Sequence, residues 1–436
     1  MMRGKATHWI IAGALAAAVA AGLAGCGGSE EGGGAGGEAA FDLKVGSLVP
    51  LTGGLASFGP PGRKAADLAT DVGQKALDNA GLDVNFTVEH ADTQTEPQAA
   101  IQAARKVLAG GATCLDGAYT SAETIALGNS VAVPQRVPLI APSSSAPALS
   151  ALDDDDFVWR TSASDALGAV ALANLVEREA GAPAETTVAL AARDDAYGEG
   201  FIEQFKTAWV ERGGGITGPV LYDPSQASFN SEAGQMVSDD PDAYVIIDFP
   251  ETYARFGAAL VRTGQFHPDR MFSNNGIAPG AEGEKAPDGI PAPAIAGSRG
   301  HRPWTPAAGE AVEAFDELYR SAGGPARHTY DAQSFDAVVL CLLAAVAAGS
   351  NEGAQIKEKL REVSAPPGRK FSYLELADAL RALADGQDID YEGVSGPVNF
   401  DERGDPTVAT FQVWSYDEGG TLEVAGEIEA NADESR

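Results

Sequence analysis

The sequence predicts an α/β protein with two lobes, each built on a parallel sheet flanked by helices. Short apolar runs alternate with longer amphipathic runs along most of the chain, and strands that alternate with helices form βαβ units. The alternation breaks near residue 163 and then resumes, which predicts a second lobe of similar build. A chain of 436 residues has room for two or three such units.

The first lobe is expected to begin with four strands and three helices. The strands are predicted at 45–49, 84–88, 113–117 and 137–141, and the helices at 61–77, 97–108 and 122–131. The second lobe has helices predicted at 166–180, 200–212 and 251–263, and strands at 187–191, 243–248, 269–272 and 290–295. Four helical patterns follow at 306–321, 331–348, 354–363 and 373–384, and then short strands at 397–400, 407–416 and 422–424.

Three loops that follow first-lobe strands are rich in Gly, Ser and Thr, and each precedes a helix. They span 51–59, 117–122 and 141–147. Open parallel sheets bind ligands at the carboxyl ends of their strands, where hydroxyls and free N–H groups favour a negatively charged or polar head. Taken singly, Ser121 and Ser145 are explained as plain helix caps. Three such loops at one sheet edge predict a site for a small carboxylate or another polar head.

The N-terminal segment has the layout of a cleaved secretory signal. Arg3 and Lys5 precede an apolar run over 9–21, and small residues follow it. The run Leu23-Ala24-Gly25-Cys26 resembles the lipobox of bacterial lipoproteins, which implies a lipid on Cys26. An ordinary signal with a chance cysteine is the alternative, and the apolar run is too short for a spanning helix. Residues 1–25 are therefore expected to be a signal peptide and 26–40 a Gly-rich tether, which places the protein outside the cytoplasm.

The net charge of −32 excludes several function classes. A chain this acidic repels nucleic acid, so a DNA- or RNA-binding role is not expected. The acidic run Asp153 to Asp156 is expected to be a solvated loop rather than a cation site. The histidines are scattered without a metal-ligand spacing, so neither a metal nor a cofactor is expected.

Two cysteines remain in the body of the chain. Cys114 and Cys341 both lie in apolar runs, where a free cysteine is commonly a small buried hydrophobe. An oxidising compartment permits a disulfide between them. Their apolar surroundings favour two free thiols.

An ordered set of short motifs resembles the type I periplasmic binding proteins, closest to the leucine/isoleucine/valine-binding proteins of ABC importers. The motifs include Leu51-Thr52-Gly53, Pro138 to Ser143, Phe157 to Thr161 with Asp165, Asp195 to Gly200, and Gly396 to Asp401 with Gly404-Asp405. The resemblance covers about residues 41–424 and implies two Rossmann-like lobes joined by a three-segment hinge. Crossovers near Ala163, Gly300 and Ser395 would divide the chain into lobe 1 (41–163 and 301–394), lobe 2 (164–300 and 395–428) and a tail (429–436).

The resemblance also implies which residues hold the ligand. In the first lobe the matching positions are Ser121, Ser143, Ser145 and Phe58, and Tyr119 lies in the same loop as Ser121. In the second lobe they are Tyr197 and Phe249.

One position departs from the family. Asn275 stands where the amino acid binders carry an acid that pairs with the α-ammonium, and an amide cannot supply that charge. Either Asp248 substitutes, or the ligand lacks an ammonium and is an amide, an aromatic acid or another small carboxylate.

The expected function is reversible capture of a small polar ligand by a monomer that is held at the membrane and delivers the ligand to an ABC permease. One alternative is a receptor subunit that reports the ligand to a membrane kinase. A remote alternative is a secreted hydrolase that uses Ser143 to Ser145 with His301 or His328, but no Gly-x-Ser-x-Gly elbow surrounds these serines. An enzyme is not expected.

Overall fold

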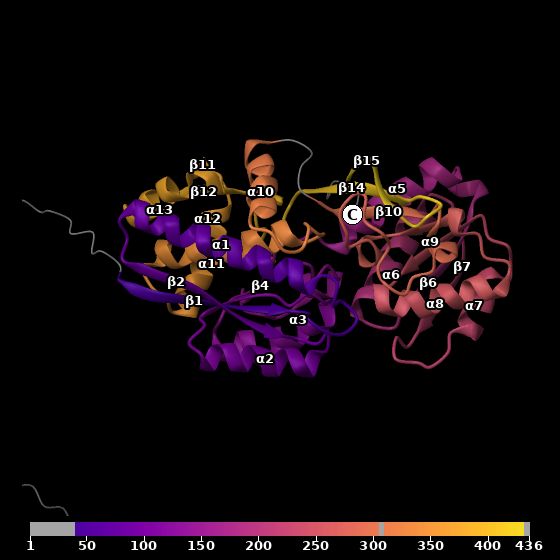
Figure 1. Ribbon diagram of the computed structural model, residues 1–436, viewed down its shortest axis with the longest axis horizontal. Coiled ribbons are helices and arrows are strands. Elements are labelled where there is room, and N and C mark those ends of the chain that lie inside the picture. Colours follow the sequence, from indigo (N-terminus) through magenta and orange to yellow (C-terminus); the bar gives the residue numbers. More distant parts are fainter. Residues whose placement is uncertain (1–39, 305–308, 431–436) are drawn as a thin grey trace, which may run out of the picture. The chain divides into compact units, whose positions relative to one another are not determined.

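The computed structural model describes residues 40–304 and 309–430. The predicted signal peptide, all but the last residue of the tether, Cys26 and residues 431–436 of the predicted tail lie outside these ranges. Figure 1 shows helices and strands arranged around two main sheets, and a third, small sheet accompanies them.

The first sheet has five parallel strands in the order β2-β1-β3-β4-β5. They are β1 (Phe41–Val49), β2 (Val84–Asp92), β3 (Cys114–Asp116), β4 (Leu139–Ala141) and β5 (Val158–Arg160). The four predicted strands are confirmed, whereas β5 was not predicted, because its apolar run covers only Phe157 to Trp159 between Asp156 and Arg160. Because the chain winds outward in both directions from β1 and β3, the loops that follow these two strands meet at a topological switch point.

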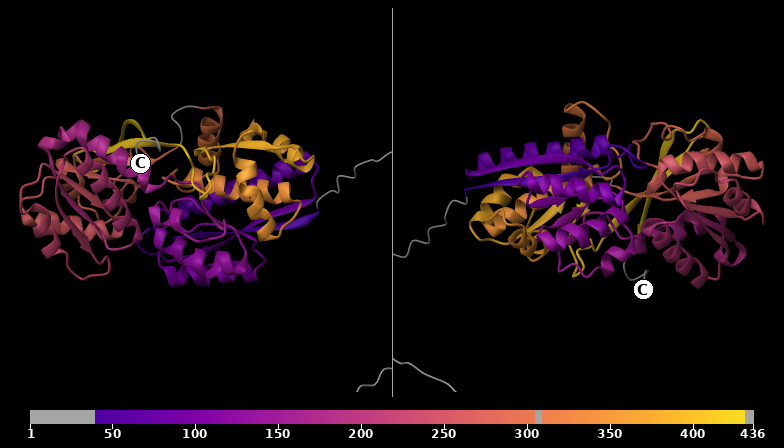
Figure 2. Two further views of the ribbon diagram at one scale, coloured as in Figure 1. Left: turned by 180° about the vertical axis from the view of Figure 1, so that it is seen from behind. Right: turned by 90° about the horizontal axis from the view of Figure 1, so that it is seen from below.

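Helices cover both faces of the first sheet. One face packs against α1 (Gly59–Ala80), α11 (Asp331–Ala348), α12 (Gly353–Ser364) and α13 (Leu376–Ala384), with α10 (Glu310–Ser321) at its border. The other packs against α2 (Pro97–Ala109) and α3 (Ser121–Leu127). The helix predicted over 122–131 ends early as α3 and continues through a wider turn, Gly128–Ala132, into α4 (Val133–Gln135). Figure 2 shows how orange helices from late in the chain lie beside the indigo strands of its beginning.

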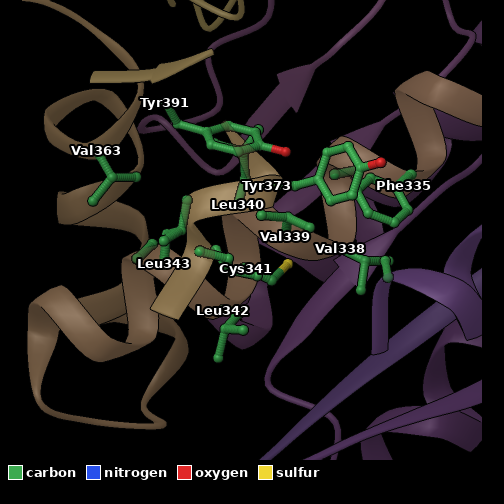
Figure 3. Packing of buried hydrophobic residues seen from close by; sticks show 14 of the residues in the cluster. Phe335, Val338, Val339, Leu340, Cys341, Leu342, Leu343, Val363, Tyr373 and Tyr391 are labelled. Carbon is green, nitrogen blue, oxygen red and sulfur yellow. The ribbon is translucent and has the colours of Figure 1, made fainter. Parts of the chain in front are cut away.

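Helix α11 is the centre of the first core. It is long and apolar enough to cross a membrane, but 89% of it is buried inside the protein. Figure 3 shows its side chains, among them Leu340 and Leu343, packed with Val363 of α12 and with Tyr373 and Tyr391. Burial on all sides explains why this helix is apolar around its circumference from Ala337 onward.

A disulfide joins Cys114 of β3 to Cys341 of α11, with 6.1 Å between the Cα atoms. The prediction of two free thiols is therefore wrong. Both residues are fully buried, as their apolar surroundings indicated. What the sequence did not show is that α11 packs directly against β3, which brings together two residues 227 positions apart.

The second sheet has seven strands in the order β15-β14-β10-β9-β8-β6-β7. The parallel strands are β6 (Thr187–Arg193), β7 (Gly215–Tyr222), β8 (Ala243–Ile247), β9 (Met271–Ser273) and β10 (Arg299–Pro303). Two antiparallel strands extend it, β14 (Ala409–Tyr416) and β15 (Leu422–Ala430). Strand β7 was not predicted because it contains Pro219, which only an edge strand tolerates readily.

The helices of the second sheet also cover both faces. One face packs against α5 (Asp165–Ala180) and α6 (Ala196–Glu211), and the other against α7 (Asn230–Val237), α8 (Pro250–Thr263) and α9 (Ala292–Ile295). The strand predicted over 290–295 is wrong, because α9 occupies that segment. Pro291 and Pro293 lack the N–H groups that a sheet ladder needs.

The chain passes between the two sheets three times, at 161–164, between β10 and α10, and at 401–408. Two of the three crossovers lie at positions other than those expected from the sequence. Gly300 lies inside β10 of the second sheet. Gly396, next to Ser395, lies in β13 (Gly396–Pro397). This strand pairs with β12 (Ile389–Gly393), which also pairs with β11 (Arg369–Phe371), in the small sheet beside the first core. We call the first sheet with its helices the first lobe and the second sheet with its helices the second lobe.

Candidate ligand-binding site

A pocket lies at the carboxyl ends of the strands of both main sheets. The lining residues follow β1, β3 and β4 in the first lobe and β6, β8 and β9 in the second. The cavity that these side chains enclose is only about 20 Å³, so a ligand would have to displace some of them. The lining consists of Leu55, Phe58, Tyr119, Thr120, Ser121, Ser143, Tyr197, Phe249, Asn275, Gly276 and Tyr330, all of them buried except for small fractions of their surface.

The loop after β3 presents Ser121 to the pocket. Thr120 caps α3 in a capping box, in which the Glu123 carboxylate accepts hydrogen bonds from the Thr120 N–H at 3.0 Å and from its hydroxyl at 2.8 Å. Burial raises the pKa of Glu123. Since Thr120 is engaged with Glu123, the side-chain polar groups left for a ligand on this loop are those of Ser121 and Tyr119. The Ser121 oxygen accepts the Ala146 N–H at 3.1 Å, and its proton has no acceptor among the described residues.

The three consecutive serines of the loop after β4 are held by the protein itself. The Ser143 hydroxyl donates to the backbone oxygen of Tyr119 at 2.5 Å, and Ser144 bonds to Thr124 at 2.7 Å. The Ser145 hydroxyl donates to the Asp165 carboxylate at 2.9 Å. Ser143 lines the pocket and can still accept a hydrogen bond, whereas Ser145 does not line it.

Aromatic rings from both lobes form the apolar wall of the pocket. Phe58 and Tyr330 of the first lobe lie 6.0 Å apart between ring centroids. Tyr197 and Phe249 of the second lobe are stacked at 5.1 Å. These rings and Tyr119 belong to one buried apolar cluster, which suits a ligand with an apolar or aromatic body.

Asn275 lies in the pocket lining, and Asp248 does not. The Asn275 amide is 3.5 Å from the Tyr197 hydroxyl, which in turn donates to the Asn274 side-chain oxygen at 2.7 Å. Asp248 is fully buried behind the wall, where it accepts from the Tyr222 hydroxyl at 2.8 Å and lies 3.7 Å from Arg193. Asp248 is therefore occupied by protein partners rather than directed at a ligand amine.

Four buried carboxyl groups surround the pocket without lining it. They are Asp116, Asp165, Asp248 and Asp331, and burial raises the pKa of each to about 7. Burial likewise raises the pKa of Tyr119, Tyr197 and Tyr330 far above the ordinary tyrosine value, so these phenols stay protonated. The lining is thus uncharged and carries hydroxyl and amide donors beside aromatic rings. The chemistry of this lining suits a ligand with a hydrogen-bond-accepting head and an apolar body.

Four lining residues were missed in the sequence: Leu55, Thr120, Gly276 and Tyr330. Tyr330 precedes α11 with a φ of 78°, and no local pattern indicates that a residue so late in the chain reaches this edge of the sheet. Gly276 had a signal in its residue type, because a Cβ there would lie 2.1 Å from the backbone oxygen of Asp248.

The histidines of the hydrolase alternative lie apart from the serines. His301 of β10 is buried beside Phe201 and Phe411, and burial lowers its pKa to about 4. His328 is 3.2 Å from the backbone oxygen of Ser57 and 3.1 Å from Glu284. In residues 40–304 and 309–430 neither imidazole forms a hydrogen bond to Ser143, Ser144 or Ser145.

The fold and the pocket define a class of protein in which two α/β lobes present their strand ends to one small ligand. Residues 42–420 match the sequence model of the periplasmic binding protein family, and the chain belongs to that family. It resembles the Leu/Ile/Val-binding proteins, and the family implies a location outside the cytoplasm. The predicted fold is thereby confirmed.

Two relatives and two solved structures illustrate the likeness. A Leu/Ile/Val-binding protein homolog 3 from Brucella melitensis is 30% identical over 182 residues, which is 42% of this chain and 47% of that protein. The chain thus spans about half the length of this relative. The substrate-binding protein BasB of a chemotactic signal transduction system in Halobacterium salinarum is 26% identical over 365 residues, 82% of this chain and 83% of that one.

Both structures share the fold at low sequence identity. LivJ of Streptococcus pneumoniae in complex with isoleucine superposes with a TM-score of 0.70 at 19% identity, covering 89% of this chain and 99% of that one. A solute-binding protein of Rhodopseudomonas palustris HaA2 in complex with p-hydroxybenzoic acid has a TM-score of 0.70 at 16% identity, covering 90% and 98%.

Proposed function

We propose that this protein captures a small ligand with a carboxylate or amide head and an apolar or aromatic body, and delivers it to an ABC permease. The observation that carries the proposal is the uncharged pocket, in which hydroxyl and amide donors lie beside aromatic rings from both lobes. No carboxylate of the described residues lines it, so a free ammonium on the ligand would lack an ionic partner.

The proposed mechanism is closure of the two lobes on the ligand. Ser121 and Asn275 would hold the polar head, and Phe58, Tyr330, Tyr197 and Phe249 would enclose the body. The connections at 161–164 and 401–408 would absorb hinge motion. Lipidation of Cys26 would keep the protein near its membrane partner and raise its effective concentration there.

A thermal-shift and calorimetry panel tests the ligand class. It compares 4-hydroxybenzoate and other aromatic acids, small amides, branched-chain amino acids and short peptides, since a bound ligand raises the melting temperature by mass action. We expect aromatic acids or amides to bind more tightly than amino acids. Binding of amino acids alone would contradict the assignment of the head group.

A second candidate is a role in sensing. The observation that favours it is the match to BasB over 82% of this chain, because that relative belongs to a chemotactic signal transduction system. Pull-down from membranes with ligand present separates the two roles. Recovery of a permease and its ATPase supports import, and recovery of a membrane signalling protein without them supports sensing.

A further inference from the structure

Arg160 is a buried cation at the end of β5, and its side chain is 2% exposed. Its guanidinium binds the Asp405 carboxylate in the bidentate manner, with Nε 2.6 Å and Nη2 2.8 Å from the two oxygens. Nη2 also donates to the Ser150 hydroxyl at 2.7 Å. Nη1 donates to the backbone oxygen of Ala146 at 3.1 Å. The fork shape of the group lets it hold the carboxylate and the loop after β4 at once, which a lysine cannot do.

Asp405 lies in the connection 401–408, and this connection runs close along β5. The Arg160 N–H donates to the backbone oxygen of Gly404 at 3.0 Å. Gly404 has a φ of 74°, and a Cβ there would lie 2.8 Å from the backbone oxygen of Val158. Ser150 adds a hydrogen bond of 2.6 Å to Asp405. Arg160 directly precedes the connection 161–164, so the ion pair ties together two of the three connections between the lobes.

The same ion pair reaches the pocket through one residue. Ala146, whose oxygen accepts from Arg160, donates its N–H to the oxygen of Ser121 in the pocket lining. On the other side of Ala146, Ser145 is fixed to Asp165 at the end of the connection 161–164 by two hydrogen bonds of 2.8 and 2.9 Å. Through Ser145 and Ala146, the loop after β4 is therefore bound both to Ser121 of the pocket and to the connections 161–164 and 401–408.

We propose that Arg160 is a positioning residue of the ligand site. The connection 401–408 determines where Asp405 lies, and Asp405 fixes the Arg160 guanidinium. Arg160 in turn holds Ala146, which orients the Ser121 hydroxyl. Ligand affinity and hinge position are then coupled through one buried ion pair. The proposal rests on the proposed function only in taking this pocket as the ligand site. A change at Asp405, far from the ligand, alters the site because a buried arginine that loses its carboxylate must shift toward other partners or toward water.

The test compares Asp405→Asn with a matched control, Asp336→Asn. Asp336 is a buried first-lobe carboxylate, and it bonds to Tyr391 and to the segment 394–395 rather than to the loop after β4. Ser150→Ala is a milder second variant, in case the loss of the Asp405 charge prevents folding. Asp405→Glu, which keeps the charge, is the rescue variant. Each protein is measured by hydrogen exchange without ligand and by calorimetry with 4-hydroxybenzoate and with L-isoleucine.

We expect Asp405→Asn and Ser150→Ala to speed amide exchange in residues 141–150. Asp336→Asn should leave exchange in that segment unchanged, although its melting temperature should fall by about as much as that of Asp405→Asn. Affinity for the bound probe should fall at least about threefold in Asp405→Asn, recover partly in Asp405→Glu and stay the same in Asp336→Asn. Unchanged exchange in 141–150, or unchanged affinity despite faster exchange, overturns the proposal. If wild type binds neither probe, the ligand class of the proposed function fails, and the exchange comparison still decides the role of Arg160.

Discussion

The Ser145 hydroxyl donates a hydrogen bond of 2.9 Å to the Asp165 carboxylate, and the Asp165 N–H donates to the Ser145 backbone oxygen at 2.8 Å. This reciprocal pair joins the loop after β4 to the first residue of α5. It assigns Ser145 to the connection between the lobes and leaves Ser121 as the serine whose proton faces the pocket. Two serines that look alike in the sequence therefore have different consequences when they are removed.

Ser121→Ala should weaken binding of a carboxylate ligand by about 1.5–3 kcal/mol, because it removes a donor to a charged head. Ser145→Ala should affect affinity less and should lower the free energy of unfolding by about 1–3 kcal/mol, since the buried Asp165 loses a partner. Calorimetry and urea denaturation of both variants check the contrast. Equal losses of affinity would contradict the assignment of Ser121 to the ligand.

Asn275→Asp should shift specificity toward ligands that carry an ammonium. The new carboxylate lies in the pocket lining, where it can pair with an amine and repel an acid. We expect the ratio of affinities for L-isoleucine and 4-hydroxybenzoate to rise about tenfold or more, which corresponds to about 1.4 kcal/mol. Asn275→Ala is the control, because it removes the amide without adding charge. An unchanged ratio in Asn275→Asp would show that this position does not meet the ligand head.

Asp116 should make the protein less stable as the pH rises toward neutrality. Its pKa is raised by burial to about 7, above the usual value of 3.8 that it regains on unfolding. The folded state therefore holds this proton more tightly, and the stabilisation is present at low pH and lost as the pH rises through 7. In wild type, Asp116 should lower the free energy of unfolding by on the order of 2 kcal/mol between pH 5 and 8. This contribution should be absent in Asp116→Asn.

Urea denaturation at several pH values measures this slope. Asp223→Asn is the control, because that carboxylate is exposed and its pKa is lowered by hydrogen bonds from Ser225. The control should keep the decline seen in wild type. Asp165, Asp248 and Asp331 share the raised pKa, so part of the decline should persist in Asp116→Asn. A decline as steep as that of wild type would show that Asp116 contributes nothing to it.

The Cys114–Cys341 bond should stabilise the first lobe. Replacing both cysteines by alanine is expected to cost about 2–5 kcal/mol of unfolding free energy, because the bond closes a very long loop in the unfolded chain. Both sulfurs are fully buried, so reductant should act only on unfolded protein. Reductant in urea should lower the midpoint of wild type and leave the double variant unchanged. The same effect of reductant on both proteins would contradict this role.

Cys26→Ser should release the protein from the membrane while leaving ligand affinity as in wild type. The expected cause is loss of the lipid attachment site at the end of the Leu23-Ala24-Gly25-Cys26 run. Membrane fractionation and calorimetry measure the two effects. Retention in the membrane fraction would refute lipid anchoring at this residue, and weaker binding would mean that the tether contributes to the fold.

Much of the fold could be predicted, because its signals are local. The helix predicted over 331–348 coincides with α11. The strands predicted to begin at residues 45, 84 and 113 lie close to β1, β2 and β3. β5 and β7 were not predicted, since the apolar run at β5 is only three residues long between charged neighbours, and the proline in β7 argues against a strand. The site was predicted as a set of loops, and the structure shows which of their side chains line the pocket.

The sequence by itself determined the alternation of strands and helices, the two-lobed α/β fold and the loops that end at the sheet edge. These follow from hydrophobic periodicity and turn residues, which depend on neighbours a few positions away. Only the tertiary structure decided that Tyr330 reaches the pocket, that Cys341 meets Cys114, and that Arg160 joins the loop after β4 to Asp405. These contacts link residues tens to hundreds of positions apart, so they are set by how whole helices and strands pack rather than by any local pattern.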